Sequence, residues 1–123
     1  MTPKHHIVFL TGAGISQESG IITFRDANGL WNNHKIEEVA SLEGFEKNPQ
    51  LVLDFYNARR RQLDEVNPNE AHHLIAQLET KYKITIITQN IDDLHESAGS
   101  TNVLHLHGEL RKCRSSKNPN LIY

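Results

Sequence analysis

The chain has 123 residues, with 13 Lys and Arg residues against 15 Asp and Glu residues, and a formal net charge of −2. This length predicts one domain, and the near-neutral charge argues against partners such as nucleic acid or an anionic membrane. The single cysteine, Cys113, excludes an internal disulfide, and the start of the chain has no long apolar stretch, so we expect a cytoplasmic protein.

The first predicted element is a strand over the apolar run 7–10, followed by a glycine turn that enters a helix. Gly12 and Gly14 are expected to adopt positive φ and to let a ligand approach the backbone. We expect Ser16 to act as the N-cap of the helix. The unpaired N–H groups at such a helix start favour a phosphate.

Residues 26–44 are polar and mixed, which indicates a loop with short helices. Asn48 and Pro49 then predict a helix start, with the helix running from Gln50 to about Val66. A second helix is expected after Pro68. Its predicted buried face has members spaced at i, i+3, i+4 and i+7, namely Ala71, Leu74, Ile75 and Leu78.

The β-branched run 83–88 predicts the next strand, and residues 89–99 predict a loop that enters a short helix ending at Gly99. A third strand is expected from Val103 to His107, and the tail from Arg111 to Tyr123 shows no further element. Strands that alternate with helices predict an α/β fold, a partial Rossmann-like, doubly wound parallel sheet with flanking helices.

The glycine turn alone does not decide whether a nucleotide binds. The general dinucleotide fingerprint needs a third small residue where this chain has Gln17, and a turn without any ligand remains an alternative. Polar side chains nevertheless follow all three predicted strands, where ligands of parallel sheets bind. They are Ser16 and Arg25 after the first strand, Gln89, Asn90 and Asp92 after the second, and His107 at the end of the third.

Several ordered motifs between residues 5 and 112 resemble the sirtuins, the NAD-dependent protein-lysine deacylases. The motifs are Gly12-Ala-Gly-Ile-Ser16, Ser19-Gly20-Ile21, Thr23-Phe24-Arg25, Gly29-Leu30-Trp31, Thr88-Gln-Asn-Ile-Asp92 with Leu94-His95, and His107-Gly108. They correspond to the amino-terminal half of the family's catalytic core. We therefore expect residues 1–123 to form a single, incomplete NAD-binding catalytic domain.

The resemblance implies that NAD is a co-substrate and that acyl-lysine proteins are the substrates, with nicotinamide and O-acyl-ADP-ribose as products. The implied NAD-binding residues are Gly12, Ala13, Gly14, Ser16, Glu18, Thr23, Phe24, Arg25, Trp31, Gln89, Asn90, Ile91 and Asp92. His107 would be the catalytic general base, because imidazole titrates near neutral pH. His105 lies two residues earlier, so a metal pair is the alternative for these two histidines.

Tyr56 and Arg59 are three residues apart and so share a helix face. In the sirtuin branch that removes acidic acyl groups, such a pair binds the acyl carboxylate, which implies desuccinylase or demalonylase activity. An arginine holds a carboxylate through two parallel hydrogen bonds. Because Arg60 and Arg61 follow directly, a solvated helix face is the alternative.

The chain departs from the family in two places. Most sirtuins carry two Cys-x-x-Cys pairs for a structural zinc, whereas Cys113 has no partner, so we expect no zinc and no other metal. The strands of the second half of the core are also missing. We therefore expect a chain that folds poorly or self-associates through an exposed sheet edge, with weak activity. A catalytically inactive NAD- or ADP-ribose-binding remnant and a complementation fragment are the alternative functions.

Overall fold

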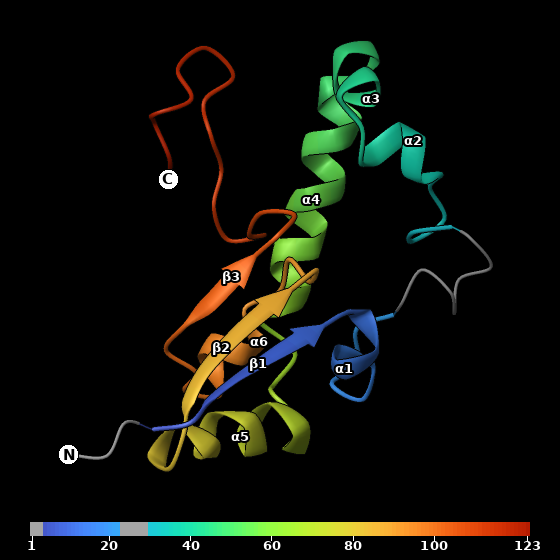
Figure 1. Cartoon of the computed structure of the whole chain (residues 1–123). Helices are drawn as coiled ribbons and strands as arrows, with labels where there is room; N and C mark the ends of the chain where they lie inside the picture. Colours follow the sequence, from blue (N-terminus) through green and yellow to red (C-terminus); the bar gives the residue numbers. More distant parts are fainter. Residues whose placement is uncertain (1–3, 23–29) are drawn as a thin grey trace.

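A three-stranded parallel sheet, β1 (His6–Thr11), β2 (Lys83–Thr88) and β3 (Val103–His105), organises one half of the molecule (Figure 1). The computed structural model of the chain describes residues 4–22 and 30–123. The strand order is β1-β2-β3, and Phe9 is paired with Ile86, which in turn is paired with Val103. The predicted parallel sheet is confirmed. The third strand is shorter than predicted, because the chain turns after His105 and reaches positive φ at Gly108.

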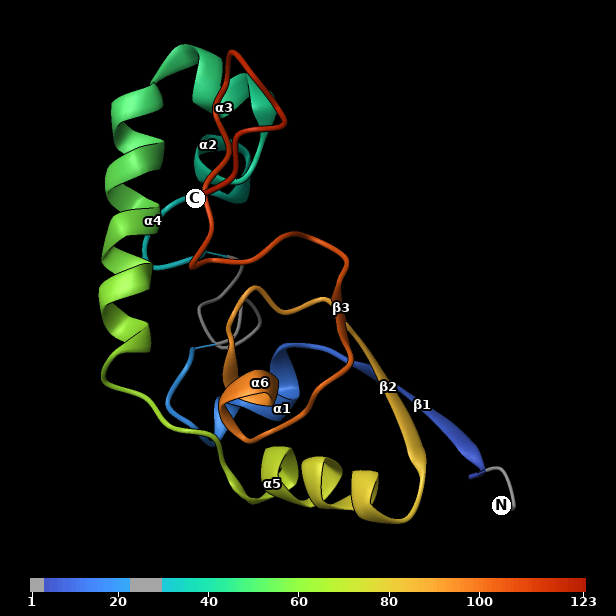
Figure 2. The ribbon, with the colours of Figure 1, turned by 90° about the vertical axis from the view of Figure 1, so that its left-hand side faces the viewer.

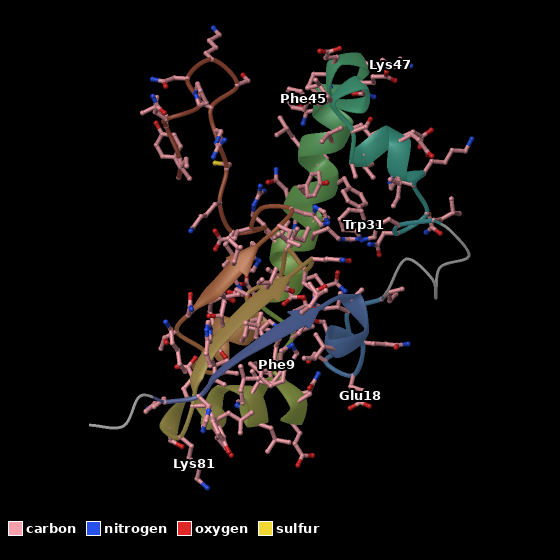
Figure 3. All side chains as sticks on the ribbon, in the orientation of Figure 1. Phe9, Glu18, Trp31, Phe45, Lys47 and Lys81 are labelled. Atoms are coloured by element: carbon pink, nitrogen blue, oxygen red, sulfur yellow. The ribbon has the colours of Figure 1, made fainter. Side chains whose placement is uncertain are left out.

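The hydrophobic core lies on one face of this sheet, against α5 (Glu70–Gln77) and the short 3₁₀ helix η1 (Leu78–Thr80). Ile75 packs on Ile84 and Ile86, and Phe9 packs against the same cluster (Figure 3). The predicted buried face of this helix is wrong in part. Leu74 is 53% exposed, whereas His72 is fully buried. The helix is turned toward His72 because that ring packs against the ring of His95, with centroids 5.0 Å apart.

The opposite face of the sheet carries large apolar side chains that are at least half exposed. They are Val8, Leu10, Leu104 and Leu106. Along β1 and β3 the exposed residues alternate with partly buried ones, as the two-residue period of a strand requires, and Leu106 follows directly after β3. Within the described residues, the buried hydrophobic cluster therefore lies on one side of the sheet.

Three helices, α2 (Ile36–Val39), α3 (Leu42–Lys47) and α4 (Pro49–Leu63), form a second group beyond the carboxyl ends of the strands (Figures 1 and 2). The helix α4 begins as predicted: the side chain of Asn48 accepts a hydrogen bond from the Leu51 amide at 3.1 Å, and Pro49 is the first helical residue. The helix α3 packs so tightly on α2 that a Cβ on Gly44 would lie 2.4 Å from the carbonyl oxygen of Glu38.

Two short helices, α1 (Ala13–Gln17) and α6 (Leu94–Ser97), follow the carboxyl ends of β1 and β2. The helix α6 ends before Gly99 as predicted, and this glycine has a φ of +107°. The tail folds back on itself, with a β-bridge between Arg114 and Ile122 that the sequence did not indicate. No helix in the described ranges has the length and apolarity needed to span a membrane.

Candidate functional site

The carboxyl ends of β1 and β2 meet in a buried polar network, here called the strand-end cluster and formed by Gly12, Ser16, Asn90 and Asp92. The Ser16 hydroxyl donates to a carboxylate oxygen of Asp92 at 2.8 Å. The side-chain amide of Asn90 donates to the carbonyl oxygen of Gly12 at 2.9 Å and to Ser16 Oγ at 3.3 Å. All three polar side chains belong to residues less than 10% exposed. The structure thus brings together residues that sequence reasoning placed at separate strand ends.

The local role predicted for Ser16 is wrong. Gly12 is the N-cap of α1, and Ser16 lies inside the helix, where its hydroxyl faces Asp92. The expected positive φ at Gly12 and Gly14 is also wrong, since Gly12 is extended with a φ of −139° and neither residue is among those with positive φ. Packing within the described part of the chain does not require glycine at either position. A Cβ on Gly14 would have no heavy atom within 4 Å, so open space lies beside the backbone here.

The other predicted NAD-binding residues near the glycine turn lie outside the buried strand-end cluster. Ala13 and Gln89 are exposed, and Gln89 Oε1 is 3.9 Å from the position that a Cβ on Gly12 would occupy. Glu18 is exposed at the C-cap of α1 and points away from the sheet (Figure 3). Thr23, Phe24 and Arg25 lie outside the described residues.

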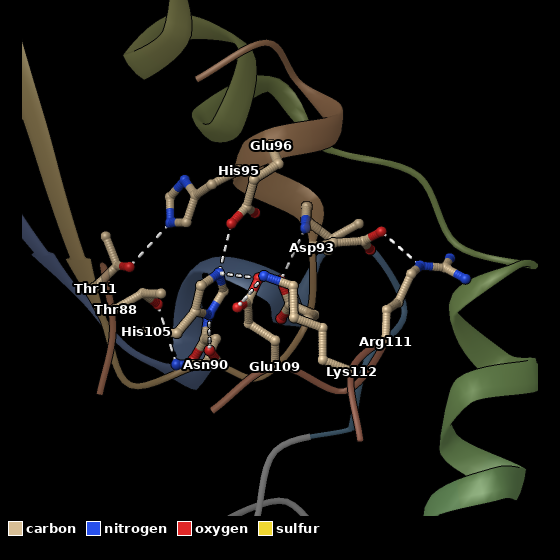
Figure 4. Close-up of polar contacts among 12 residues, drawn as sticks. Thr11, Thr88, Asn90, Asp93, His95, Glu96, His105, Glu109, Arg111 and Lys112 are labelled. Atoms are coloured by element: carbon tan, nitrogen blue, oxygen red, sulfur yellow. Dashed lines mark hydrogen bonds and ion pairs between the residues drawn. The ribbon is translucent and has the colours of Figure 1, made fainter. Parts of the chain in front are cut away.

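The end of β3 separates the two histidines that were considered as a pair. His107 lies in the turn after the strand and is exposed. The His105 side chain is only 6% exposed, and its two ring nitrogens contact the Asn90 carbonyl oxygen at 2.8 Å and Glu96 Oε1 at 2.5 Å (Figure 4). The two imidazoles therefore face different surroundings, and they do not form the metal pair that the strand pattern left open.

A hydrogen bond accounts for the contact between His105 and Glu96. These two residues and Glu109 bring their possible ligand atoms within 4.8 Å of one another. A metal ion about 2.0–2.2 Å from each ligand would hold His105 Nε2 and the Glu96 oxygen farther apart than the observed 2.5 Å. Burial by itself lowers the pKa of His105, but its bonds to Glu96 and Asn90 outweigh this and raise the pKa.

A small pocket of about 50 Å³ opens between α4 and the strand-end cluster; it is here called the α4 pocket. Its walls include Trp31, Arg59, Ile91 and Asp92. Three of these were predicted to bind NAD and one to bind substrate. A larger and more open depression of about 550 Å³ lies at the amino-terminal end of β2, near Lys83, and contains none of the predicted site residues. The α4 pocket is therefore the better candidate for a functional site.

Arg59 is the most unusual residue of the α4 pocket. Its Nε and Nη1 atoms are buried and have no hydrogen-bond partner among the residues that the structure describes. The guanidinium carbon lies 5.3 Å from the centre of the Phe55 ring, and burial lowers the pKa of Arg59. Burial also raises the pKa of Tyr56, whose ring meets Trp31 edge to face at 5.9 Å.

The three consecutive arginines have different surroundings. Arg60 donates through Nε to the carbonyl oxygen of Leu110 at 2.6 Å, and Arg61 is exposed. The solvated helix face that was considered for this run therefore describes Arg61, but not Arg59 or Arg60.

Sequence reasoning missed two anchors of the site. His105 fixes the backbone of Asn90, and Asn69, the N-cap of α5, reaches α1. The Asn69 amide donates to the carbonyl oxygen of Ile15 at 2.7 Å and to Ser19 Oγ at 3.0 Å. The position of Asn69 just before a helix signalled a cap, but no pattern in the sequence signalled its second contact.

Known proteins resemble this chain over most of its length. The Sir2 family model matches residues 12–121. A Helicobacter pylori protein named NAD-dependent protein deacylase is 66% identical over 118 residues, which are 96% of this chain and 52% of that protein.

Two solved structures have the same fold over nearly the whole chain. A Sir2 homologue in complex with NAD is 47% identical with a TM-score of 0.85, and it covers 98% of this chain and 47% of its own. A Sir2 protein bound to an acetylated peptide is 33% identical with a TM-score of 0.77. The match covers 97% of this chain and 46% of that protein's chain. This chain thus spans about half the length of its relatives. The match over residues 12–121 shows that the chain belongs to the Sir2 family.

Proposed function

We propose that this chain is part of an NAD-dependent protein deacylase whose preferred substrates carry acidic acyl groups on lysine. The general activity is supported by the relatives named NAD-dependent protein deacylase and by the similar structures with NAD and with an acetylated peptide. The acyl preference rests on a single observation, the two buried guanidinium nitrogens of Arg59 that have no hydrogen-bond partner in residues 4–22 and 30–123.

The glycine turn is the proposed binding site for the diphosphate of NAD. The first amides of α1 have no partner within the helix, as at any helix start, and Gly12 supplies no capping side chain. The open space beside Gly14 leaves room for a ligand against the backbone. These features fit a phosphate-bearing ligand, and Gln89 lies near Gly12 at the start of the same helix.

The nicotinamide end of NAD would lie between the strand-end cluster and the α4 pocket. Bound NAD would supply the carbon that accepts the acyl oxygen and the nicotinamide leaving group. Asp92 and Ile91 line the pocket, and Asn90 is fixed beside it by Gly12. His107 is exposed at the end of the sheet where these residues meet, so its imidazole is free to accept a proton from a ribose hydroxyl.

The acyl group would point toward Arg59. A buried polar group without a partner costs about 1–3 kcal/mol, and more if it is charged, so two guanidinium nitrogens that find no partner among the described residues need an explanation. A carboxylate on the bound acyl chain would accept from both, and the hydroxyl of Tyr56, one helical turn earlier, would add a third hydrogen bond. A neutral acetyl group offers no such charge.

Turnover of succinyl-lysine and acetyl-lysine peptides tests this assignment. In Arg59→Met and Tyr56→Phe variants we expect kcat/KM for the succinyl peptide to fall about 10- to 100-fold, with acetyl turnover within a few-fold of the original. Arg61→Met is the matched control, because this exposed arginine should leave both activities unchanged. An unaltered succinyl-to-acetyl ratio in Arg59→Met would rule out the acyl preference.

The same assay separates an enzyme from a protein that only binds nucleotide. His107→Ala should lower turnover about 10²- to 10⁴-fold, the usual contribution of a general base, while NAD binding stays. Binding of NAD without turnover by the unaltered protein would favour the inactive remnant.

A further inference from the structure

His105 is buried between two groups that only accept hydrogen bonds. Its Nδ1 lies 2.8 Å from the carbonyl oxygen of Asn90, and its Nε2 lies 2.5 Å from Glu96 Oε1 (Figure 4). A neutral imidazole carries one N–H and can donate to only one of them. With Glu96 ionised, both contacts are hydrogen bonds only when the ring holds two protons and a positive charge.

The charges around His105 favour this protonated form. Glu96 approaches from α6, and Glu109 lies 4.0 Å from the same nitrogen on the segment after β3. Lys112 pairs with Glu109 at 2.8 Å and weakens its influence, and the neighbouring His95 opposes a second positive charge. The net effect of burial, hydrogen bonds and charges is a raised pKa for His105.

The backbone carbonyl oxygen of Asn90 accepts a hydrogen bond from His105, while the Asn90 side chain contacts other residues. The Asn90 amide donates to Gly12 and Ser16, and its own N–H donates to Thr88 Oγ1 at 3.0 Å. The contact from His105 therefore connects the third strand to the segment after β2 and, through Asn90, to the strand-end cluster.

We propose that protonated His105 is a positioning residue that fixes the backbone of Asn90 and, through it, the surface that binds the nicotinamide end of NAD. The second part of this role rests on the proposed function. His105 touches no reacting atom and is distinct from His107, which lies exposed two residues later. Because the pKa of His105 is raised, both contacts are made at pH values below that pKa, and the ring can keep only one of them as pH rises through it.

NAD binding measured by calorimetry between pH 6.5 and 9.5 tests the role in the intact protein. We expect the affinity of the unaltered protein to fall about tenfold on the alkaline side, the size expected for one charge-assisted hydrogen bond. Glu96→Gln should shift this decrease to lower pH, because it removes the charge that favours the imidazolium. His105→Asn should abolish the pH dependence, since an amide donates without titrating. His5→Asn, on an exposed histidine, is the control.

Nuclear magnetic resonance of the same samples gives a readout that does not need NAD. The backbone amide of Asn90 should titrate with the midpoint of the His105 ring, and Glu96→Gln should lower both midpoints together. If Asn90 does not follow the ring, or if the affinity decrease stays in place in Glu96→Gln, the positioning role is wrong. If NAD fails to bind at any pH while Asn90 still follows His105, the proposed function is contradicted and the contact itself is supported.

Discussion

The strand-end cluster and the α4 pocket both bury polar side chains, but they treat them differently. In the cluster, Ser16, Asn90 and Asp92 donate to and accept from one another. In the pocket, Arg59 keeps two buried N–H groups without a partner in the described part of the chain. The first region is completed by its own residues. The second has a hydrogen-bonding capacity that a ligand is suited to fill.

This difference separates stability from function. A satisfied buried network makes its region more rigid, whereas an unsatisfied buried charge lowers stability and is kept where binding needs it. We therefore expect substitution of Ser16 to act mainly on folding, and substitutions of Arg59 to act mainly on substrate choice.

The largest expected effect compares Gly44, packed between α3 and α2, with Gly14, in the helix next to the strand-end cluster. Gly44→Ala should lower the free energy of unfolding by about 3 kcal/mol, because the new Cβ would overlap backbone oxygen of Glu38 in α2. Gly14→Ala should leave stability unchanged or raise it by up to about 1 kcal/mol, since its Cβ meets open space within a helix. Urea unfolding monitored by circular dichroism measures both.

The order of the two effects should reverse for NAD binding: Gly14→Ala should weaken it more than Gly44→Ala. The Cβ of Gly14→Ala would occupy the open space assigned to NAD and weaken its binding. A Gly14→Ala variant that binds NAD normally, or a Gly44→Ala variant as stable as the original, would remove the contrast between these positions.

A smaller effect is expected from Ser16→Ala in the strand-end cluster. It removes the donor to Asp92 and leaves a buried carboxylate oxygen unsatisfied, at a cost of about 1–3 kcal/mol in unfolding free energy. Ser97→Ala, at an exposed position, should stay within about 0.5 kcal/mol and serves as the control. Equal stabilities of the two variants would show that the cluster contributes nothing to folding.

The smallest expected effect is a loss of stability in mild acid. His72 and His95 are almost fully buried, and burial lowers the pKa of each ring. Their neutral forms stabilise the fold, so stability should decrease as pH falls below about 6.5, the value in the unfolded chain. His105 acts in the opposite direction, so a His105→Asn variant isolates the effect. Its melting temperature should be lower at pH 5.5 than at pH 7.5, and a flat profile would contradict the assignment.

Much of the fold could be predicted because its signals are local. The strand 83–88 is a run rich in β-branched residues, and its predicted ends match those in the structure. Asn48 and Pro49 mark a helix start through their own side chains. The meeting of Ser16 with Asn90 and Asp92 followed from parallel topology, which brings carboxyl ends to one edge.

The remaining features depend on contacts between distant residues. The buried face of α5 contains His72 in place of Leu74, because the ring of His95, 23 positions away in sequence, packs against it. The contact of His105 with Asn90 needs the exact point at which β3 ends, and the sequence pattern extended that strand by two residues. Hydrophobic periodicity carries no information on such polar partners.

The two contacts of Asn69 have a chemical consequence. Its side-chain oxygen caps α5 by accepting from the Ala71 amide at 3.0 Å, while its nitrogen holds α1 through Ile15 and Ser19. Deamidation to aspartate keeps the capping oxygen and the shape of the side chain, but it replaces the donating nitrogen with an oxygen that the Ile15 carbonyl repels. Deamidation of Asn69 would therefore weaken the attachment of α1, and with it of the glycine turn, while α5 keeps its N-terminal cap.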